Sequence, residues 1–220
     1  KGLKTPVVDG ARIRGLVERQ IMQHLEALLP TPPHPKRVLI FTAMTRSYDI
    51  ALSCRDAGYE AIYGDFGFAL GLPLPVRRLN TLHFLARILM PVISRLPFEI
   101  FYPTGERQHA IRPQFNQWYN WATVIADDFY FIKSHLPDRL DGKIIVTNST
   151  TAADVDLLRE RGVAYLCTST PRLEGRTFGT NMIEAVLTAI AGKGRPLTQQ
   201  ELRTILKEVD LAPTVIPLNP

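Results

Sequence analysis

Residues 36–65, KRVLIFTAMTRSYDIALSCRDAGYEAIYGD, decide the fold of this chain. Residues 38–43 are an apolar, partly β-branched run that predicts a buried strand. Residues 48–57 predict a helix that ends before Gly58, and residues 60–65 predict a second strand with an acidic end. Strand, turn, helix and strand in this order are the outline of the βαβ unit of dinucleotide-binding folds.

The turn after the first predicted strand lacks the glycines that let a pyrophosphate approach the backbone. Its six residues are Thr42, Ala43, Met44, Thr45, Arg46 and Ser47. We expect Thr42, Ala43, Thr45, Arg46 and Ser47 to contact a cofactor, with the last three holding a phosphate. Asp65 is expected to accept ribose hydroxyls, which favours NAD, whereas Arg46 leaves NADP open.

The same rhythm of strands and helices resumes in the second half of the chain. Residues 122–129, 143–151 and 163–169 predict a third, a fourth and a fifth strand. Residues 152–161 and 181–191 predict helices that follow the last two of these strands. We therefore expect an α/β, Rossmann-like, doubly wound and mainly parallel five-stranded sheet, with its strands in the order 2-1-3-4-5.

Helices and a tail flank the predicted sheet. Residues 11–29 predict one amphipathic helix that docks on the sheet, and the proline-rich residues 30–35 predict a stiff hinge. Residues 193–220 predict a last helix and a poorly ordered tail. The expected plan is a docking helix and hinge over 1–35, a Rossmann-like domain over 36–192, and the C-terminal helix and tail.

Two predicted helices carry a capping box, in which a threonine and an acidic residue three positions later bond to each other's backbone. Thr151 and Asp154 form this pattern before the helix of residues 152–161. Thr198 and Glu201 form it before the last helix. Both patterns predict where a helix begins.

A helical insertion at about residues 66–121 interrupts the rhythm. Glycines and prolines predict a loop up to residue 75, and residues 76–96 predict a helix that is apolar on most faces. We expect that helix to be buried or to form a homodimer, because its basic residues are too scattered for a lipid surface. Residues 97–113 predict either a charged turn or a substrate-gating loop. The aromatic residues expected in the core are Phe115, Trp118, Tyr119 and Trp121.

Polar residues follow most of the predicted strands. Parallel strands end on one edge of a sheet, so we expect these residues to border one crevice. The further cofactor-binding candidates at the strand ends are Asn148, Thr168, Ser169 and Thr170. Capping of the following helices explains part of these hydroxyls equally well. Asp127 and Asp128 are neighbours that would point to opposite faces of a strand, so they cannot act as a carboxylate pair.

The loop after the fifth predicted strand combines hydroxyls, glycines and two arginines before a helix. The N-terminus of a helix favours an anion, although a solvent-exposed connection of turn residues has the same composition. The expected contacts of a substrate or other anion are Arg172, Arg176, Thr177, Gly179, Thr180 and Asn181. Asn181 has a second interpretation, as a helix cap that works with Glu184.

The composition narrows the class of protein. The 220 residues carry a formal net charge of +5, with 45% hydrophobic residues, which is ordinary for a folded domain. Lysines and arginines do not form one run, so an anionic small molecule is expected as partner and nucleic acid is not. Cys54 and Cys167 are the only cysteines, and no signal peptide is recognisable, which favours the cytoplasm.

The sequence shows no pattern typical of a membrane segment, a metal site or a nucleophilic catalytic site. No run of about twenty apolar residues predicts stable membrane insertion. The five histidines are scattered without the spacing of metal ligands, and no nucleophile and base stand together. The pattern therefore indicates binding more firmly than catalysis. Because the chain begins with Lys1 rather than methionine, we expect it to be a fragment or a trimmed product.

Five motifs give the chain a resemblance to a known family. They are KTPVVDG (4–10), FALGLPLP (68–75), RLPFEIFYPTGERQ (95–108), LPDRLDGKIIVTN (136–148) and LEGRTFGTNMIEAVL (173–187). With these motifs the chain resembles bacterial proteins described as quinate 5-dehydrogenase or shikimate-dehydrogenase-like. That resemblance implies a nicotinamide-binding domain of Rossmann type with the cofactor across the strand ends.

Two hypotheses remain open. The first is an NAD- or NADP-dependent oxidoreductase, or a dehydrogenase-like domain, that acts on a small hydroxy acid such as quinate or shikimate. The second is a non-redox module of Rossmann type that binds another nucleotide or an anionic metabolite. The missing glycines and the absent acid and base favour the second hypothesis.

Overall fold

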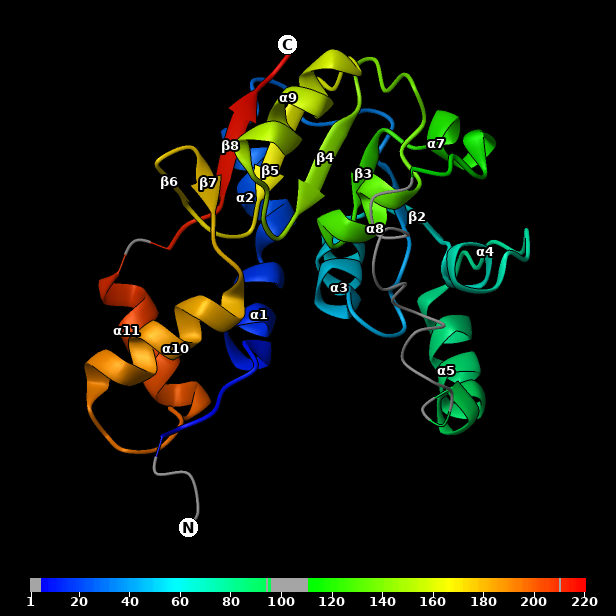
Figure 1. Cartoon of the computed structure of the whole chain (residues 1–220). Coiled ribbons are helices and arrows are strands. Elements are labelled where there is room, and N and C mark those ends of the chain that lie inside the picture. The colour runs from blue at the N-terminus through cyan, green and yellow to red at the C-terminus, as the bar shows by residue number, and fades with distance from the viewer. Residues whose placement is uncertain (1–4, 94, 96–110, 210) are drawn as a thin grey trace.

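The computed structural model describes residues 5–93, 95, 111–209 and 211–220. Its main sheet has six strands in the order β2-β1-β3-β4-β5-β8 (Figure 1). Their bounds are β1 Arg37–Ile40, β2 Glu60–Tyr63, β3 Val124–Ala126, β4 Ile144–Thr147, β5 Tyr165–Thr168 and β8 Thr214–Pro217. The first five strands pair in parallel, which confirms the predicted order 2-1-3-4-5. An α/β fold with a mainly parallel sheet is compatible with a Rossmann-like arrangement.

The predicted number of five strands is wrong, because the C-terminal tail is not poorly ordered. Residues Thr214–Pro217 form β8, which pairs antiparallel with β5 from Thr168 to Tyr165. An edge strand has unpaired backbone groups, and β8 satisfies those of β5 along that edge. The sequence predicts a poorly ordered tail because prolines flank this strand, and four residues are too few to show a clear alternation of apolar and polar side chains.

Helices cover both faces of the sheet (Figure 1). One face packs against α2 (Ile21–Leu28) and α3 (Tyr48–Asp56). The other face packs against α7 (Asn116–Trp121), α8 (Phe129–Ser134) and α9 (Ala152–Glu160). This layering buries most residues of the five parallel strands, as their nearly continuous apolar runs predict, whereas β8 at the edge is only half-buried.

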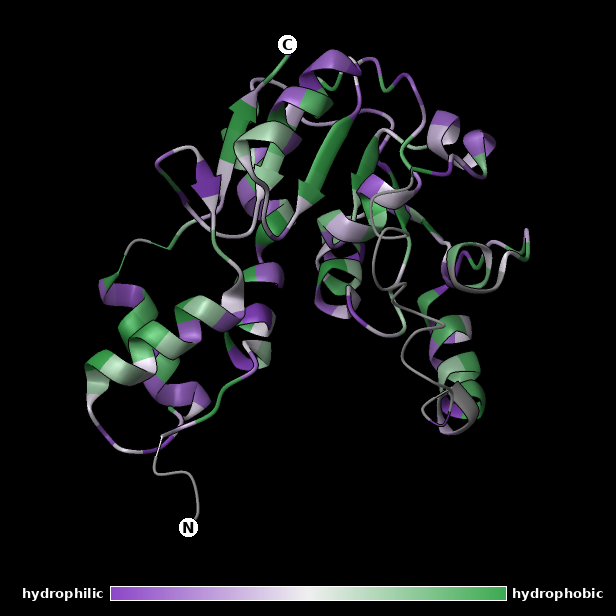
Figure 2. Ribbon diagram, in the orientation of Figure 1, coloured by the Kyte–Doolittle hydropathy of each residue, from purple (hydrophilic) through white to green (hydrophobic). Residues whose placement is uncertain are grey.

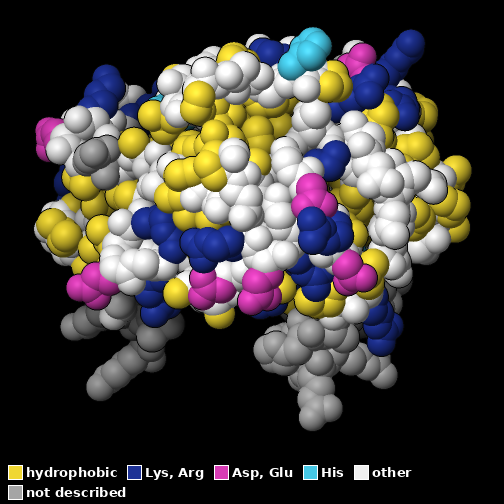
Figure 3. Space-filling view, turned by 90° about the horizontal axis from the view of Figure 1, so that it is seen from above, with side chains coloured by type: hydrophobic (Ala, Val, Ile, Leu, Met, Phe, Trp, Pro, Cys, Tyr) yellow, Lys and Arg dark blue, Asp and Glu magenta, His cyan; other side chains and the backbone are white. Residues whose placement is uncertain are grey.

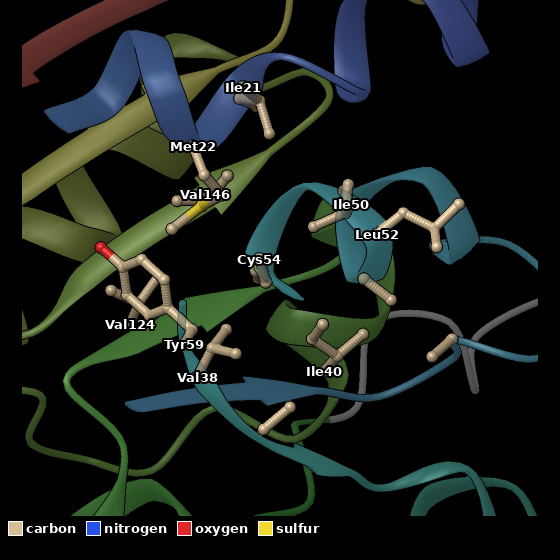
Figure 4. Packing of buried hydrophobic residues seen from close by; sticks show 14 of the residues in the cluster. Ile21, Met22, Val38, Ile40, Ile50, Leu52, Cys54, Tyr59, Val124 and Val146 are labelled. Atoms are coloured by element: carbon tan, nitrogen blue, oxygen red, sulfur yellow. The ribbon is translucent and has the colours of Figure 1, made fainter. Parts of the chain in front are cut away.

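Successive side chains of a strand point to opposite faces of the sheet, so the core consists of two clusters, one on each face. Val38 and Ile40 of β1 face the cluster of α2 and α3, whose packing is shown in Figure 4. Leu39 and Phe41 face the opposite cluster. Side chains that are two positions apart in a strand lie on one face, so a run that is apolar at every position fills both clusters. The strands of the main sheet are accordingly mostly green in Figure 2, where green marks hydrophobic residues.

Three helices form a separate cluster beyond the carboxyl ends of the strands (Figure 1). They are α1 (Ala11–Glu18), α10 (Thr180–Ala191) and α11 (Gln199–Glu208). Ile13 of α1, Leu187 of α10 and Leu202 of α11 meet in its core. The chain thus brings its first helix against its last two helices.

The prediction of one continuous helix over residues 11–29 is wrong. The chain turns at Arg19 and Gln20, so that α1 and α2 are two helices. Ile13 then packs against α10 and α11, whereas Ile21 and Leu25 pack against α3 and the sheet. Two apolar faces with different partners require the bend.

The insertion is more helical than predicted. Residues Asp65–Leu70 form the short helix α4 in place of the expected loop, so Asp65 begins a helix and does not end the strand. The predicted helix of residues 76–96 is α5, Leu79–Ile93, which contains Pro91. Leu79 and Leu82 are buried, whereas Phe84 and Ile88 are exposed, so only one face of α5 is covered.

The other predictions for the insertion divide into two. The charged turn or gating loop of residues 97–113 lies mostly outside the described residues, which exclude 96–110. Trp118 and Tyr119 are buried in the core as predicted, and the rings of Phe115 and Trp118 stack with centroids 4.4 Å apart. The aromatic residues before β3 therefore belong to packing.

Two further findings concern the described part of the chain. No helix in it is long and apolar enough to cross a membrane. Cys54 and Cys167 are both buried and free.

Figure 3 views the molecule from the amino ends of the parallel strands, where lysine and arginine side chains lie close to acidic ones.

Candidate functional site

The turn from β1 to α3 is closed by a carboxylate of the protein. Asp127, directly after β3, accepts hydrogen bonds from the backbone N–H groups of Phe41 and Thr42, both at 2.8 Å. The Thr42 hydroxyl donates to the same carboxylate at 2.7 Å. Asp127 is fully buried, and burial raises its pKa to about 6, so it is ionised at neutral pH. The predicted contact of Thr42 with a cofactor is therefore replaced by an internal one.

The next amides of this turn also point inward. The N–H groups of Thr45, Arg46 and Ser47 all donate to the carbonyl of Thr42, at 3.2, 2.9 and 3.0 Å. These bonds form the first turn that leads into α3. A phosphate needs N–H groups that point toward solvent, and these three are already bonded.

Asp65 holds the same turn from the other side. Its Oδ1 accepts a hydrogen bond from the N–H of Met44 at 2.7 Å, and the backbone of Ala43 is a further partner. Asp65 is only 6% exposed, and burial raises its pKa to about 7. Asp65 thus ties the turn to α4, and its carboxylate is not presented to a ribose.

These contacts test whether a dinucleotide fits the place where a Rossmann-type fold holds it. Every backbone N–H from Phe41 to Ser47 has an acceptor inside the protein. The acid that would bind ribose is buried. The residues therefore do not fit a pyrophosphate held against the first turn.

Glu18 adds a further buried acid beside this turn. It is the last residue of α1, and its Oε2 is buried without a hydrogen-bond partner among the described residues. Burial raises its pKa to about 8, opposed by Arg14 and reinforced by Asp49 and Asp127. Glu18 is therefore mostly protonated and neutral at pH 7.

Arg46 connects the first turn with the end of β4. Its Nε donates to Oδ2 of Asp128 at 2.6 Å, and the side-chain amide of Asn148 donates to the same oxygen at 2.9 Å. Oδ1 of Asn148 in turn accepts from the N–H of Ser149 at 2.7 Å. The predicted site residues Arg46 and Asn148 are thus brought together through Asp128, which the sequence placed within a strand.

A pocket of about 400 Å³ opens at the carboxyl end of β4. Its walls come from the start of α8, from residues 148–151 between β4 and α9, from residues 176–179, and from Met182 of α10. Its lining combines hydroxyl and amide groups with the aromatic side chains of Phe129, Tyr130 and Phe178. This volume and mixture suit a small polar molecule with an apolar part.

The charged side chains around the pocket form two ion pairs, and Arg176 belongs to neither of them. Lys133 pairs with Asp154, with Nζ and Oδ1 2.7 Å apart, and Asp128 pairs with Arg46. Arg176 lies with its guanidinium 5.3 Å from the ring centroid of Phe178. Within the described residues no acidic side chain pairs with Arg176. Among the described residues, Arg176 is therefore a lining residue whose positive charge no acidic side chain neutralises.

A small hairpin fixes the position of Arg176. It consists of β6 (Arg172–Leu173) and β7 (Arg176–Thr177). Thr177 is bonded twice to the end of β4: its hydroxyl oxygen accepts from the N–H of Thr150 at 2.6 Å, and its N–H donates to the Thr150 carbonyl at 3.1 Å. The hairpin is thereby attached to residues 148–151, which form the facing wall.

Arg172 supports the hairpin and does not line the pocket. Its guanidinium donates to the Thr150 hydroxyl at 3.0 Å and to the carbonyl of Gly175. Burial lowers its pKa, although the group remains a cation at neutral pH. The predicted anion contact of Arg172 is therefore occupied by hydrogen bonds of the protein.

The three hydroxyl residues after β5 are internal. Thr168 donates to the carbonyl of Thr170 at 3.0 Å, and Thr170 donates to the carbonyl of Phe178 at 3.0 Å. Ser169 lies 3.5 Å from the carbonyl of Asn148. All three are buried, and none borders the pocket. Their predicted role as cofactor contacts is replaced by a role in shaping the loop.

The start of α10 corrects another prediction. The N-cap is Gly179, which lines the pocket, and no side chain caps the helix. Asn181 therefore does not cap with Glu184. Glu184 is fully buried toward α1, 3.5 Å from Arg12, and Thr180 is buried as well. Of this group only Gly179 borders the pocket.

The pocket thus unites part of the predicted site with residues that the sequence did not indicate. Predicted residues that line it are Asn148, Arg176, Thr177 and Gly179. Lys133, Asp154 and Phe178 line it without having been predicted. Lys133 lies in a helix and Asp154 was recognised only as a cap, so neither carried a recognisable pattern. Among the residues that the structure describes, no three or more His, Cys, Asp and Glu side chains are placed to hold a metal ion.

Comparison with known proteins places the chain in a family. No curated protein and no solved structure matches it. A family described as "Domain of unknown function (DUF8754)" matches residues 12–218. This match spans almost all of the 220 residues, from α1 to the end of β8. The chain therefore belongs to the family of the domain of unknown function DUF8754.

Proposed function

We propose that the chain is a non-redox binding protein that holds a small anionic metabolite in the pocket at the end of β4. The observation that carries this proposal is that Arg176 lines the pocket and has no acidic partner among the described residues. Arginine binds carboxylate and phosphate through charge-assisted hydrogen bonds, and the hairpin fixes its backbone. The closed turn after β1 favours this function over dinucleotide binding.

The charge balance favours a carboxylate as the anionic group. Arg176 supplies one positive charge, because Lys133 is paired with Asp154. One cation matches a monoanion better than the two or more charges of a pyrophosphate. The hydroxyl and amide groups of Asn148 and Ser149 add polar contacts, which suit a hydroxylated ligand. Quinate and shikimate, which the sequence resemblance suggests, are therefore the first ligands to examine.

Calorimetry tests this function. We expect saturable binding of quinate or shikimate, and an affinity that falls about tenfold or more in Arg176→Ala, because a hydrogen bond to a charged group is lost. Arg176→Lys retains the charge and loses less. Arg203→Ala, an exposed arginine on α11, is the matched control and leaves the affinity unchanged. Unchanged affinity in Arg176→Ala would contradict the proposal.

The second candidate is an NAD- or NADP-dependent dehydrogenase-like protein that acts on a small hydroxy acid. The parallel sheet with strand order 2-1-3-4-5 favours it. In this case the dinucleotide is held away from the closed first turn. Thermal shift with NAD and NADP, and the absorbance of reduced cofactor in the presence of quinate, distinguish it from the first candidate. A cofactor-dependent reaction supports the dehydrogenase, and binding of the acid alone supports the non-redox function.

Two properties of the protein as a whole complete the proposal. We propose a cytoplasmic location, which suits the two unpaired cysteines. A homodimer through α5 is proposed because Phe84 and Ile88 are exposed at 63% and 55%. Light scattering of the wild type and of Phe84→Ser measures it, and a monomeric wild type contradicts the dimer.

A further inference from the structure

The turn after β1 contains an anion that belongs to the protein. Both N–H groups at its start, from Phe41 and Thr42, donate to the carboxylate of Asp127. The Thr42 hydroxyl and the N–H of Asp128 donate to the same carboxylate, both at 2.7 Å, and the Ser47 side chain is a further hydrogen-bond partner. A carboxylate that accepts backbone and hydroxyl donors in this way has the surroundings of a bound anion.

We infer that Asp127 is a built-in anionic ligand of the first βα turn, and that removing its side chain leaves a site for a small exogenous carboxylate. The donors are held by the backbone of β1 and by its connection to α3, so they remain in place without Asp127. The fully buried position excludes water from competing in the native protein. The carboxylate is ionised at neutral pH even though burial raises its pKa to about 6.

This inference explains why the first turn has no glycine fingerprint. Glycines allow a phosphate to approach backbone N–H groups. Here the anion is the side chain of Asp127, directly after the neighbouring strand β3, so the turn does not need to admit a phosphate. The turn can therefore carry Ala43 and Met44. Ligand binding is left to the end of β4, where Arg176 has no acidic partner within the described part of the chain.

Chemical rescue by formate tests the inference, since formate with the shortened side chain of Asp127→Ala replaces the lost carboxylate. We expect Asp127→Ala to lower the melting temperature by about 5–10 °C, because buried N–H groups lose their acceptor. About 0.1 M sodium formate should then raise the melting temperature of this variant by about 3 °C or more over sodium chloride of equal concentration.

Three controls make the result specific. The wild type and Asp138→Ala, which removes an exposed acid, should show no such difference between formate and chloride. Asp127→Asn fills the same volume and should not respond to formate. The double variant Asp127→Ala, Arg176→Ala should still respond, which separates this site from the pocket of the proposed function.

Each outcome bears on the inference. A selective effect of formate on Asp127→Ala and on the double variant supports it, and so does an Asp127→Ala protein that folds only when formate is present. An equal response of all variants, loss of the response in the double variant, or failure of Asp127→Ala to fold with formate while Asp127→Asn folds would overturn it. Failure here leaves the result of the Arg176 experiment unaffected.

Discussion

Two turns at the same edge of the sheet differ in whether their polar groups are bonded within the protein or line a pocket. The turn after β1 has its amides bonded to Asp127, to Asp65 and to the Thr42 carbonyl. The connection after β4, residues 148–151, instead forms a wall of the pocket. Both follow buried parallel strands, so the sheet alone does not determine where a ligand binds.

The difference lies in where the neighbouring carboxylates point. Asp127 turns its carboxylate into the protein against β1, whereas Asp128 turns toward Arg46 and Asn148 at the surface side. A buried acid satisfies backbone donors and closes a turn. Asp128 neutralises Arg46, whereas Arg176 lines the pocket without an acidic partner among the described residues.

The largest expected effect breaks the closed turn. Asp127→Ala should reduce the free energy of unfolding by about 3–5 kcal/mol, because two buried N–H groups and a hydroxyl lose their acceptor. Asn148→Ala, in the open connection, should cost about 1 kcal/mol, since its amide lies at a partly buried site. Urea denaturation of both variants measures the contrast, and equal losses would contradict it.

The next effect depends on pH and concerns the acid beside the closed turn. The folded protein raises the pKa of Glu18 from 4.5 to about 8, so it binds more protons than the unfolded chain between these values. The contribution of Glu18 to stability is full below pH 4.5 and is lost as pH rises through 8.

Glu18→Gln, which cannot ionise, removes this dependence. Between pH 5 and pH 9 the wild type should lose about 1–3 kcal/mol more free energy of unfolding than Glu18→Gln. Denaturation at the two pH values measures the difference. Glu208→Gln, an exposed site at the end of α11, is the control and should follow the wild type. Parallel pH profiles of Glu18→Gln and wild type would refute the assignment.

A smaller effect is expected when the hairpin beside the pocket loses its attachment to the end of β4. Thr177→Val removes the acceptor of the Thr150 N–H and should cost about 1–2 kcal/mol of stability. It should also lower the affinity for the carboxylate ligand several-fold in calorimetry, because Arg176 belongs to the hairpin that Thr177 attaches to the end of β4. Thr204→Val on α11 removes an exposed hydroxyl and should affect neither quantity strongly. Unaltered binding in Thr177→Val would show that the hairpin does not position Arg176.

The smallest effect separates two equal caps. Thr151 and Thr198 each form a complete capping box, with Asp154 and Glu201. Replacing either threonine with alanine should cost about 1 kcal/mol. Only Thr151 lines the pocket, so only Thr151→Ala should also change ligand affinity. Thermal denaturation and calorimetry of the two variants compare these effects, and an affinity change in Thr198→Ala would contradict the expectation.

The sequence predicted those features that depend on neighbouring residues. The two capping boxes and the aromatic core before β3 follow from local runs and periods of apolar and polar residues. The strand order followed instead from the general rules for connections between parallel strands. β8 was missed because its strand pairing with β5 joins distant segments. The bend at Arg19 was missed because the two apolar faces of residues 11–29 continue one helical pattern.

The candidate site was predicted less completely than the fold. The predicted site lies at the carboxyl edge of the sheet, and four of its residues, Asn148, Arg176, Thr177 and Gly179, line the pocket at that edge. Thr42 and Asp65 were assigned to a ligand because a strand-end polar residue looks the same whether it faces solvent or a buried amide. Only contacts between separate segments, such as Phe41 with Asp127 and Met44 with Asp65, distinguish the two cases.

The packing of α1 against α10 and α11 has a consequence for how the chain folds. Arg12 and Glu184, which meet between α1 and α10, are 172 positions apart. Contacts of such long separation slow folding, since most of the chain must be ordered before they form. During synthesis α1 leaves the ribosome before α10 and α11, so its contacts with these two helices form only after they emerge. The first helix is therefore expected to gain protection from hydrogen exchange late, together with the last two.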